Sequence, residues 1–96
     1  MKTAFDVLTT ATDLVGGDRK ASHGAMAGTF DRIAALWSAY LGGRDNSDKP
    51  LTGSEVCDLM ELLKIARRQD GTFNPDDYVD GAGYAACAFQ CRCEAS

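Results

Sequence analysis

The sequence predicts an all-α protein, a compact bundle of about four helices in a single domain that spans residues 1–96. Apolar residues recur at helical spacing in successive segments, and paired glycines or a proline separate those segments. Some segments also open with residues that favour the first turn of a helix. A chain of 96 residues can bury one hydrophobic core, so we expect one domain.

The first predicted helix covers residues 3–15, and the pair Gly16 and Gly17 then favours a helix end. Its predicted apolar face consists of Phe5, Leu8, Ala11 or Thr12, and Val15. Residues 18–28 lack such periodicity and lie between glycines, so the sequence predicts an ordered loop there.

The second predicted helix starts with Thr29 as its N-cap and ends at Gly42 and Gly43. Its apolar positions are Phe30, Ile33, Ala34, Trp37, Tyr40 and Leu41. Residues 44–50 are polar and end in proline, which predicts a connection that faces solvent.

The third predicted helix begins at Thr52, because Thr52 and Glu55 have the spacing of a capping box. Gly71 ends it. Its predicted apolar stripe is Val56, Leu59, Met60, Leu63 and Ala66, and the other side carries Glu55, Asp58, Glu61, Lys64 and Arg68.

The fourth predicted helix starts with Asn74 as N-cap and Pro75 at the first helical position. Asp76 and Asp77 follow, and acidic residues interact favourably with the positive end of the helix dipole. The helix runs toward Cys91 through the apolar positions Val79, Ala82, Ala86 and Phe89.

Net charge and hydropathy restrict the possible partners and the location. The net charge is −4 and the pI about 4.7, which disfavours binding to nucleic-acid polymers because their phosphates would be repelled. No apolar run is long enough for a membrane span, and the polar N-terminal stretch does not resemble a signal peptide. We therefore expect a cytoplasmic protein with no membrane partner.

Cysteine spacing predicts reduced thiols and no metal site. Three of the four cysteines crowd near the C-terminus, no C-x-x-C pair occurs, and the single histidine is distant in sequence. The cysteines are Cys57, Cys87, Cys91 and Cys93.

Four stretches of the chain resemble a small family of phage and prophage proteins catalogued as domain of unknown function 6378. The stretches are GGDRKASHG, FDRIAALWSAYLG, EVCDLMELLKIARRQDG and DDYVDGAGYAAC, which together cover nearly the whole chain. His23 and Gly24 stand where such relatives typically have a tyrosine and a glycine. The resemblance implies a phage origin, the cytoplasm of the host cell and a compact helical fold, and it supplies no accepted activity.

Basic residues form the first candidate binding cluster. Lys64, Arg67 and Arg68 share one helical turn, and Arg19 and Lys20 lie in the predicted loop. Such side chains can converge on the phosphate of a small molecule. Alternatively, Lys64 and Arg68 pair with the nearby Glu61 and stabilise the helix.

Acidic residues form a second candidate cluster, in the pairs Glu55-x-x-Asp58 and Asp77-x-x-Asp80. Four carboxylates could hold Mg²⁺, and the first pair is similar to half of the motif of MazG-like all-α nucleotide pyrophosphohydrolases. Their other half, E-E-x-x-E, is absent. A capping box also explains Glu55, and the helix dipole explains Asp77. We expect Asp80 to form a buried pair with Arg19 or Arg67.

Aromatic residues could stack on a base, and Tyr40 and Tyr84 are better candidates than Trp37, which falls within an apolar stripe. The complete set of predicted ligand-binding residues is Arg19, Lys20, His23, Tyr40, Lys64, Arg67, Asp80 and Tyr84. We predict no catalytic residue and no cofactor, because no nucleophile and base pattern or Walker loop occurs.

The function that the sequence favours is binding of a nucleotide or other phosphorylated small molecule. Such a protein could sequester a cyclic-nucleotide or related signal of host anti-phage defence. One alternative is a Mg²⁺-dependent pyrophosphohydrolase, and another is a protein–protein inhibitor that uses a helical face. Apolar residues on several flanks predict a homo-oligomer, namely Leu62, Ile65, Tyr78 and Ala85.

Overall fold

The computed structural model describes residues 1–17, 26–42, 49–69 and 71–95. Within these ranges it contains four α-helices and no strand, which confirms the predicted all-α class. The helices are α1 (Ala4–Gly16), α3 (Met26–Leu41), α4 (Gly53–Arg68) and α5 (Pro75–Ala95).

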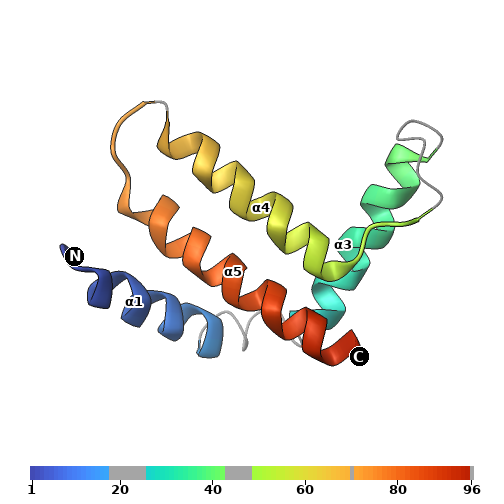
Figure 1. The fold of residues 1–96 in the computed structure, drawn as a ribbon, viewed down its shortest axis with the longest axis horizontal. Helices are drawn as coiled ribbons and strands as arrows, with labels where there is room; N and C mark the ends of the chain where they lie inside the picture. Colours follow the sequence, from blue (N-terminus) through green and yellow to red (C-terminus); the bar gives the residue numbers. More distant parts are fainter. Residues whose placement is uncertain (18–25, 43–48, 70, 96) are drawn as a thin grey trace.

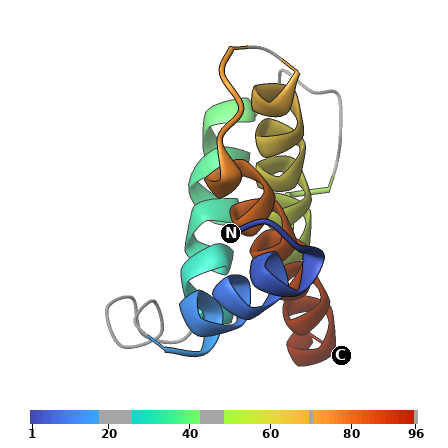
Figure 2. The same cartoon turned by 90° about the vertical axis from the view of Figure 1, so that its left-hand side faces the viewer.

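An antiparallel hairpin of α4 and α5 forms the centre of the bundle (Figure 1). Helix α3 crosses the hairpin near the N-terminal end of α4 and the C-terminal part of α5. Among the described helices, α1 packs against α5 alone (Figure 2). The molecule is elongated, with extents of 44 × 31 × 22 Å.

Helix starts follow the predicted capping signals in α4 and α5. In α4, the Thr52 hydroxyl accepts from the Glu55 amide at 3.1 Å, and the Thr52 amide donates to the Glu55 carboxylate at 3.0 Å. Asn74 Oδ1 accepts from the Asp76 amide at 3.0 Å, so Asn74 caps α5 as predicted. A further capping box, which the sequence analysis missed, joins Thr3 and Asp6 at the start of α1.

The predicted start of the second helix is wrong. Helix α3 begins at Met26, so Thr29 lies inside the helix and cannot be its N-cap. Ala27 packs against the core and extends the stripe of Phe30 and Ala34 by one turn, and this burial outweighs the low helix propensity of Gly28. The rest of the predicted loop, residues 18–25, lies outside the described residues.

The core lies where α3 and both arms of the hairpin meet. Its buried residues are Phe30, Ala34, Val56, Cys57, Cys87, Ala88 and Cys91. Helices α3 and α4 approach closely at Gly53, where an added Cβ would lie 2.7 Å from Asp31 Oδ1 and 3.3 Å from Phe30 Cβ. The Ser54 hydroxyl ties α4 to α5 by donating to the Ala88 carbonyl at 3.0 Å.

Some residues of the predicted apolar stripes are exposed instead. Phe5 and Leu8 of α1 are 76% and 59% exposed, because α1 packs against only one of the described helices, α5, and turns Ala11 toward it. Leu59 and Leu63 of α4 are 43% and 44% exposed, because α4 faces α5 with the side that carries Cys57 and Lys64.

Candidate functional site

Four of the predicted ligand-binding residues lie on the α4–α5 hairpin. Lys64 and Arg67 belong to the last turns of α4, and Asp80 and Tyr84 belong to α5. Tyr40 lies near the C-terminal end of α3, where Figure 1 shows α3 diverging from α4, and it is 72% exposed. Three others, Arg19, Lys20 and His23, lie outside the described residues.

The first interaction across the hairpin joins Lys64 and Asp80. Lys64 Nζ lies 2.9 Å from Asp80 Oδ2, and the two side chains are 13% and 28% exposed. Asp80 therefore forms the expected largely buried pair, but its partner in the described residues is Lys64 and not Arg67. Lys64 and Asp80 face each other because they occupy the adjoining sides of α4 and α5.

The second interaction joins Arg67 and Asp77. Arg67 Nε lies 3.4 Å from Asp77 Oδ1; the Asp77 side chain is 4% exposed and the Arg67 side chain 56%. Asp77 Oδ1 is buried and accepts no hydrogen bond from the described residues, so the guanidinium acts on it by charge alone. The two terminal nitrogens of the Arg67 guanidinium lie farther along the side chain than the Nε atom that pairs with Asp77.

Asp77, which the sequence places at the positive end of the helix dipole, also pairs with Arg67, and this pairing was not predicted. A signal was present in the spacing: Lys64-x-x-Arg67 and Asp77-x-x-Asp80 place matching pairs of opposite charge on one face of each helix. In an antiparallel hairpin these pairs meet in reversed order, as the structure shows.

Arg68 makes the third contact across the hairpin. Its guanidinium carbon lies 4.6 Å from the centre of the Tyr78 ring, and Phe73 contacts the same ring with 5.9 Å between centroids. Lys64 and Arg68 thus make contacts on α5 instead of the alternative pairing with Glu61. Among the described residues, the Glu61 side chain has no hydrogen bond or ion pair.

Two adjoining depressions lie beside these contacts, and both are lined by Asp77. The α4–α5 groove has a volume of about 240 Å³ and is lined by Glu61, Lys64, Ile65, Arg68, Asp77, Tyr78, Gly81, Ala82 and Ala85. The mouth, at the turn between the helices, has a volume of about 450 Å³ and is lined by Ala66, Arg67, Gly71, Thr72, Asn74 and Asp77. We call the groove and the mouth together the hairpin site.

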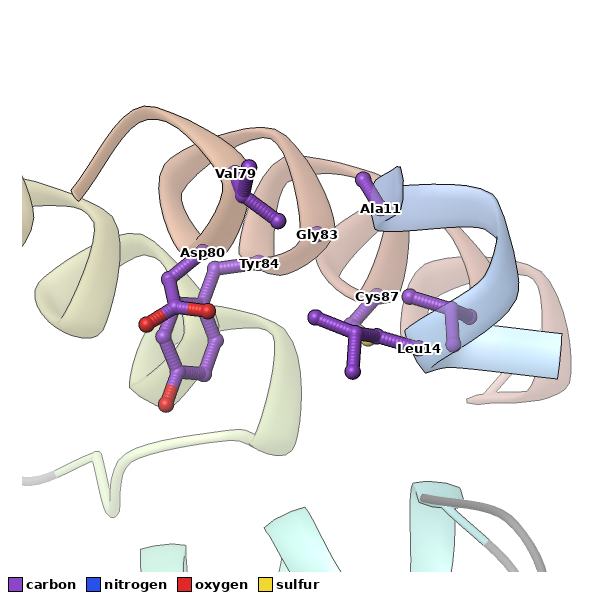
Figure 3. Close-up of a pocket in the computed structure, with 8 residues that line it drawn as sticks. Ala11, Leu14, Val79, Asp80, Gly83, Tyr84 and Cys87 are labelled. Atoms are coloured by element: carbon purple, nitrogen blue, oxygen red, sulfur yellow. The ribbon is translucent and has the colours of Figure 1, made fainter. Parts of the chain in front are cut away.

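A much smaller cavity lies between α1 and α5 (Figure 3). Its volume of about 10 Å³ is at most the size of one water, so it cannot hold a nucleotide. Asp80 and Tyr84 line it from adjacent turns of α5, and Figure 3 shows their side chains close together on one side of that helix. Tyr84 also contacts Phe30 edge to face, with 6.3 Å between ring centroids.

The carboxylates proposed for Mg²⁺ do not form a metal site in the described residues. Glu55 closes a capping box, Asp77 pairs with Arg67, and Asp80 pairs with Lys64. No group of three or more His, Cys, Asp or Glu side chains in the described part of the chain is arranged to hold a metal ion. None of the described helices is both long and apolar enough to cross a membrane.

Comparisons with known proteins identify similar sequences of phage origin. The model of the domain of unknown function DUF6378 matches residues 6–92. Gene 55 protein of Mycobacterium phage L5 is 39% identical over 81 residues, which cover 84% of this chain and 49% of that protein. Gene 55 protein of Mycobacterium phage D29 is 36% identical over 81 residues, covering 84% and 50%. This chain thus spans about half the length of these relatives, and no solved structure matches it.

Proposed function

This chain belongs to the DUF6378 family of phage proteins, and we propose that it binds a small phosphorylated molecule, a nucleotide, at the hairpin site. The site offers positive side chains from α4, acidic and aromatic side chains from α5, and a depression beside them. The whole protein carries a net charge of −4, so the positive charge is local and suits a small anion better than a nucleic-acid polymer.

The observation that carries the proposal is the orientation of Arg67. Asp77 lies behind its Nε atom, while 56% of the side chain remains exposed beside the mouth. Asp77 is buried on a helix and attracts the guanidinium by charge, and the terminal N–H groups donate to no other side chain among the described residues. A guanidinium presented in this way matches two oxygens of a phosphate.

Lys64 and Arg68 have supporting roles in this proposal. Lys64 is only 13% exposed and already paired with Asp80, so it adds positive potential and fixes the helices relative to each other. Arg68 lies over Tyr78 and can turn its edge toward the ligand while the stacking contact is kept.

We propose further that the protein sequesters its ligand and does not hydrolyse it. Three of the four carboxylates that could have held Mg²⁺ are used in a cap or in ion pairs. A small phage protein that binds a nucleotide without consuming it could remove a signal of host anti-phage defence from solution.

A thermal-shift screen with cyclic dinucleotides, cyclic trinucleotides and nucleoside phosphates tests the proposal. A ligand at a hundredfold excess over its Kd stabilises the native state by about 2.7 kcal/mol, which is several degrees for a domain of this size. We expect Arg67→Ala to weaken binding at least about tenfold, since it removes a charge-assisted contact. Arg32→Ala, which changes an exposed arginine on α3, is the matched control.

Two outcomes would decide against the proposal. If no phosphorylated compound shifts the melting temperature, the hairpin site is not a phosphate site. If a bound nucleotide is consumed, and EDTA stops its consumption, the protein is a metal-dependent hydrolase; recovery of intact ligand after heat denaturation supports sequestration.

A second candidate function is binding to a protein through the exposed side of α4. Leu59, Leu62 and Leu63 are 43%, 59% and 44% exposed there, and apolar groups in such numbers on one helix are typical of interfaces. A second copy of the chain would account for them, in agreement with the predicted homo-oligomer. Light scattering at micromolar concentration tests this idea: a mass of one chain contradicts it, and Leu62→Lys should convert an oligomer to monomers.

A further inference from the structure

We infer that the α4–α5 groove binds the base of the nucleotide and that Glu61 gives this groove a preference for guanine. The inference rests on the proposed function, because it assumes that the mouth holds the phosphate.

The groove has the size and the surface that a planar base requires. Its volume is about 240 Å³, and Ile65, Gly81, Ala82 and Ala85 give it an apolar floor. The groove and the 450 Å³ mouth have Asp77 as a common lining residue, and Lys64 and Arg68 add positive charge to the groove itself.

Among the described residues, no side chain pairs with the carboxylate of Glu61, which lines the groove. It is half-buried at the edge of the groove, one turn before Lys64 and Ile65. The two basic residues that line the groove have other contacts: Lys64 with Asp80, and Arg68 with Tyr78. A half-buried carboxylate without a partner favours a ligand that donates hydrogen bonds.

Asp77 cannot serve as that acceptor. Its side chain is 4% exposed, its Oδ1 atom is enclosed, and the Arg67 guanidinium lies against it. Glu61 therefore carries the preference among the two carboxylates that line the groove.

Guanine is the base whose edge matches a carboxylate. Its N1–H and N2 amino group lie side by side and donate two parallel hydrogen bonds, which the two oxygens of a carboxylate accept. Adenine presents one amino group next to an acceptor nitrogen, and uracil presents one N–H between two carbonyl oxygens. Both of these place an acceptor close to a carboxylate, which leaves polar groups unpaired.

Calorimetric titration of the full chain with GMP, IMP, AMP, UMP and ribose 5-phosphate tests the inference. We expect GMP to bind at least about tenfold more tightly than AMP or UMP, and IMP, which lacks the N2 amino group, to fall between them. Glu61→Gln should weaken GMP binding at least about tenfold and leave ribose 5-phosphate unchanged. Asp58→Asn, on an exposed acid of the same helix outside the groove, should change neither.

Filling the groove gives an independent measurement that does not depend on Glu61. Ala85 lines the groove and is exposed, so Ala85→Leu should block the base without disturbing the core, and GMP should then bind no better than ribose 5-phosphate. Ala86→Leu places the same side chain at an exposed position outside the groove lining and should leave GMP binding intact.

The outcomes separate this inference from the proposed function. Equal binding of GMP and ribose 5-phosphate to the parent protein would overturn the base site and keep the phosphate site. Equal binding of GMP, AMP and UMP, each tighter than ribose 5-phosphate, would overturn the guanine preference. If none of the five compounds binds, and inorganic pyrophosphate also fails to bind, the phosphate site itself is wrong.

Discussion

The two ends of the α4–α5 hairpin are built from different chemistry. At the closed end, near α3, Val56 and Cys57 are fully buried, and Cys87 and Cys91 are 5% exposed. At the open end, near the turn that joins the helices, the contacts are ion pairs and a cation–π contact, and two depressions lie beside them. Burial of apolar side chains therefore joins α4 and α5 at one end of the hairpin, whereas charged and aromatic contacts join them at the other.

The thiols of the closed end illustrate its apolar character. Burial raises the pKa of the Cys57 thiol to about 12, with Cys91 and Cys87 as neighbours that add to the effect, and burial also raises the pKa of Cys91. Such thiols stay protonated and react slowly, whereas Cys93 is exposed. The cysteine cluster therefore acts as packing in the core.

The largest effect is expected from a cavity at the closed end. Val56→Ala should lower the free energy of unfolding by about 2–3 kcal/mol, because Val56 is fully buried and the core cannot fully collapse around the gap. Leu63→Ala, which removes more atoms from a side chain that is 44% exposed, should cost less than about 1.5 kcal/mol. Urea denaturation of both variants measures the difference, and a reversed order would mean that the stability does not depend mainly on the closed end.

A smaller loss of stability is expected at alkaline pH. The unfolded Cys57 thiol ionises near its ordinary pKa of 9.0, while the folded thiol stays protonated up to about pH 12. The unfolded state therefore loses its proton first, and stability should fall as pH rises from about 9 toward 12. Melting temperatures from pH 8 to 10.5 should fall more steeply in the parent protein than in Cys57→Ala; equal slopes would contradict burial of this thiol.

The smallest of the three effects concerns the open end. A double-mutant cycle with Lys64→Met and Asp80→Asn should give a coupling of about 1 kcal/mol, because the 2.9 Å pair is largely buried but still touches solvent. Lys64→Met keeps the apolar stem of the side chain in place. A coupling near zero would mean that the ion pair does not fix the two helices relative to each other.

Local sequence signals predicted which segments form helices. They predicted only in part which side of each helix is buried. The capping box of Thr52 and Glu55 and the Asn74-Pro75 start depend on residues a few positions apart, and the structure contains both as predicted. The exposure of Leu63 depends on where α3 and α5 lie relative to α4, and periodicity cannot provide this. The early start of α3 also depends on tertiary packing, because Ala27 packs against the core.

The candidate site was predicted as a collection of residue types but not as a set of partners. The sequence placed Lys64 and Arg67 on one helical turn and predicted that Asp80 pairs with Arg19 or Arg67. It could not assign Asp80 to Lys64 or Asp77 to Arg67, because those pairs depend on the register of the hairpin. Glu61 could not be identified as a candidate binding residue from the sequence, because only the structure shows that Lys64 and Arg68 contact α5 instead of Glu61.

The attachment of α1 through a single neighbour has a consequence for local opening of the fold. Helix α1 contacts only α5 among the described helices, and Ala11 is the one buried residue of α1. Detaching α1 therefore costs less free energy than unfolding the hairpin, and the amide hydrogens of α1 should exchange with solvent before those of α4 and α5. Each such opening would expose Val79 and Cys87 while the hairpin site stays assembled.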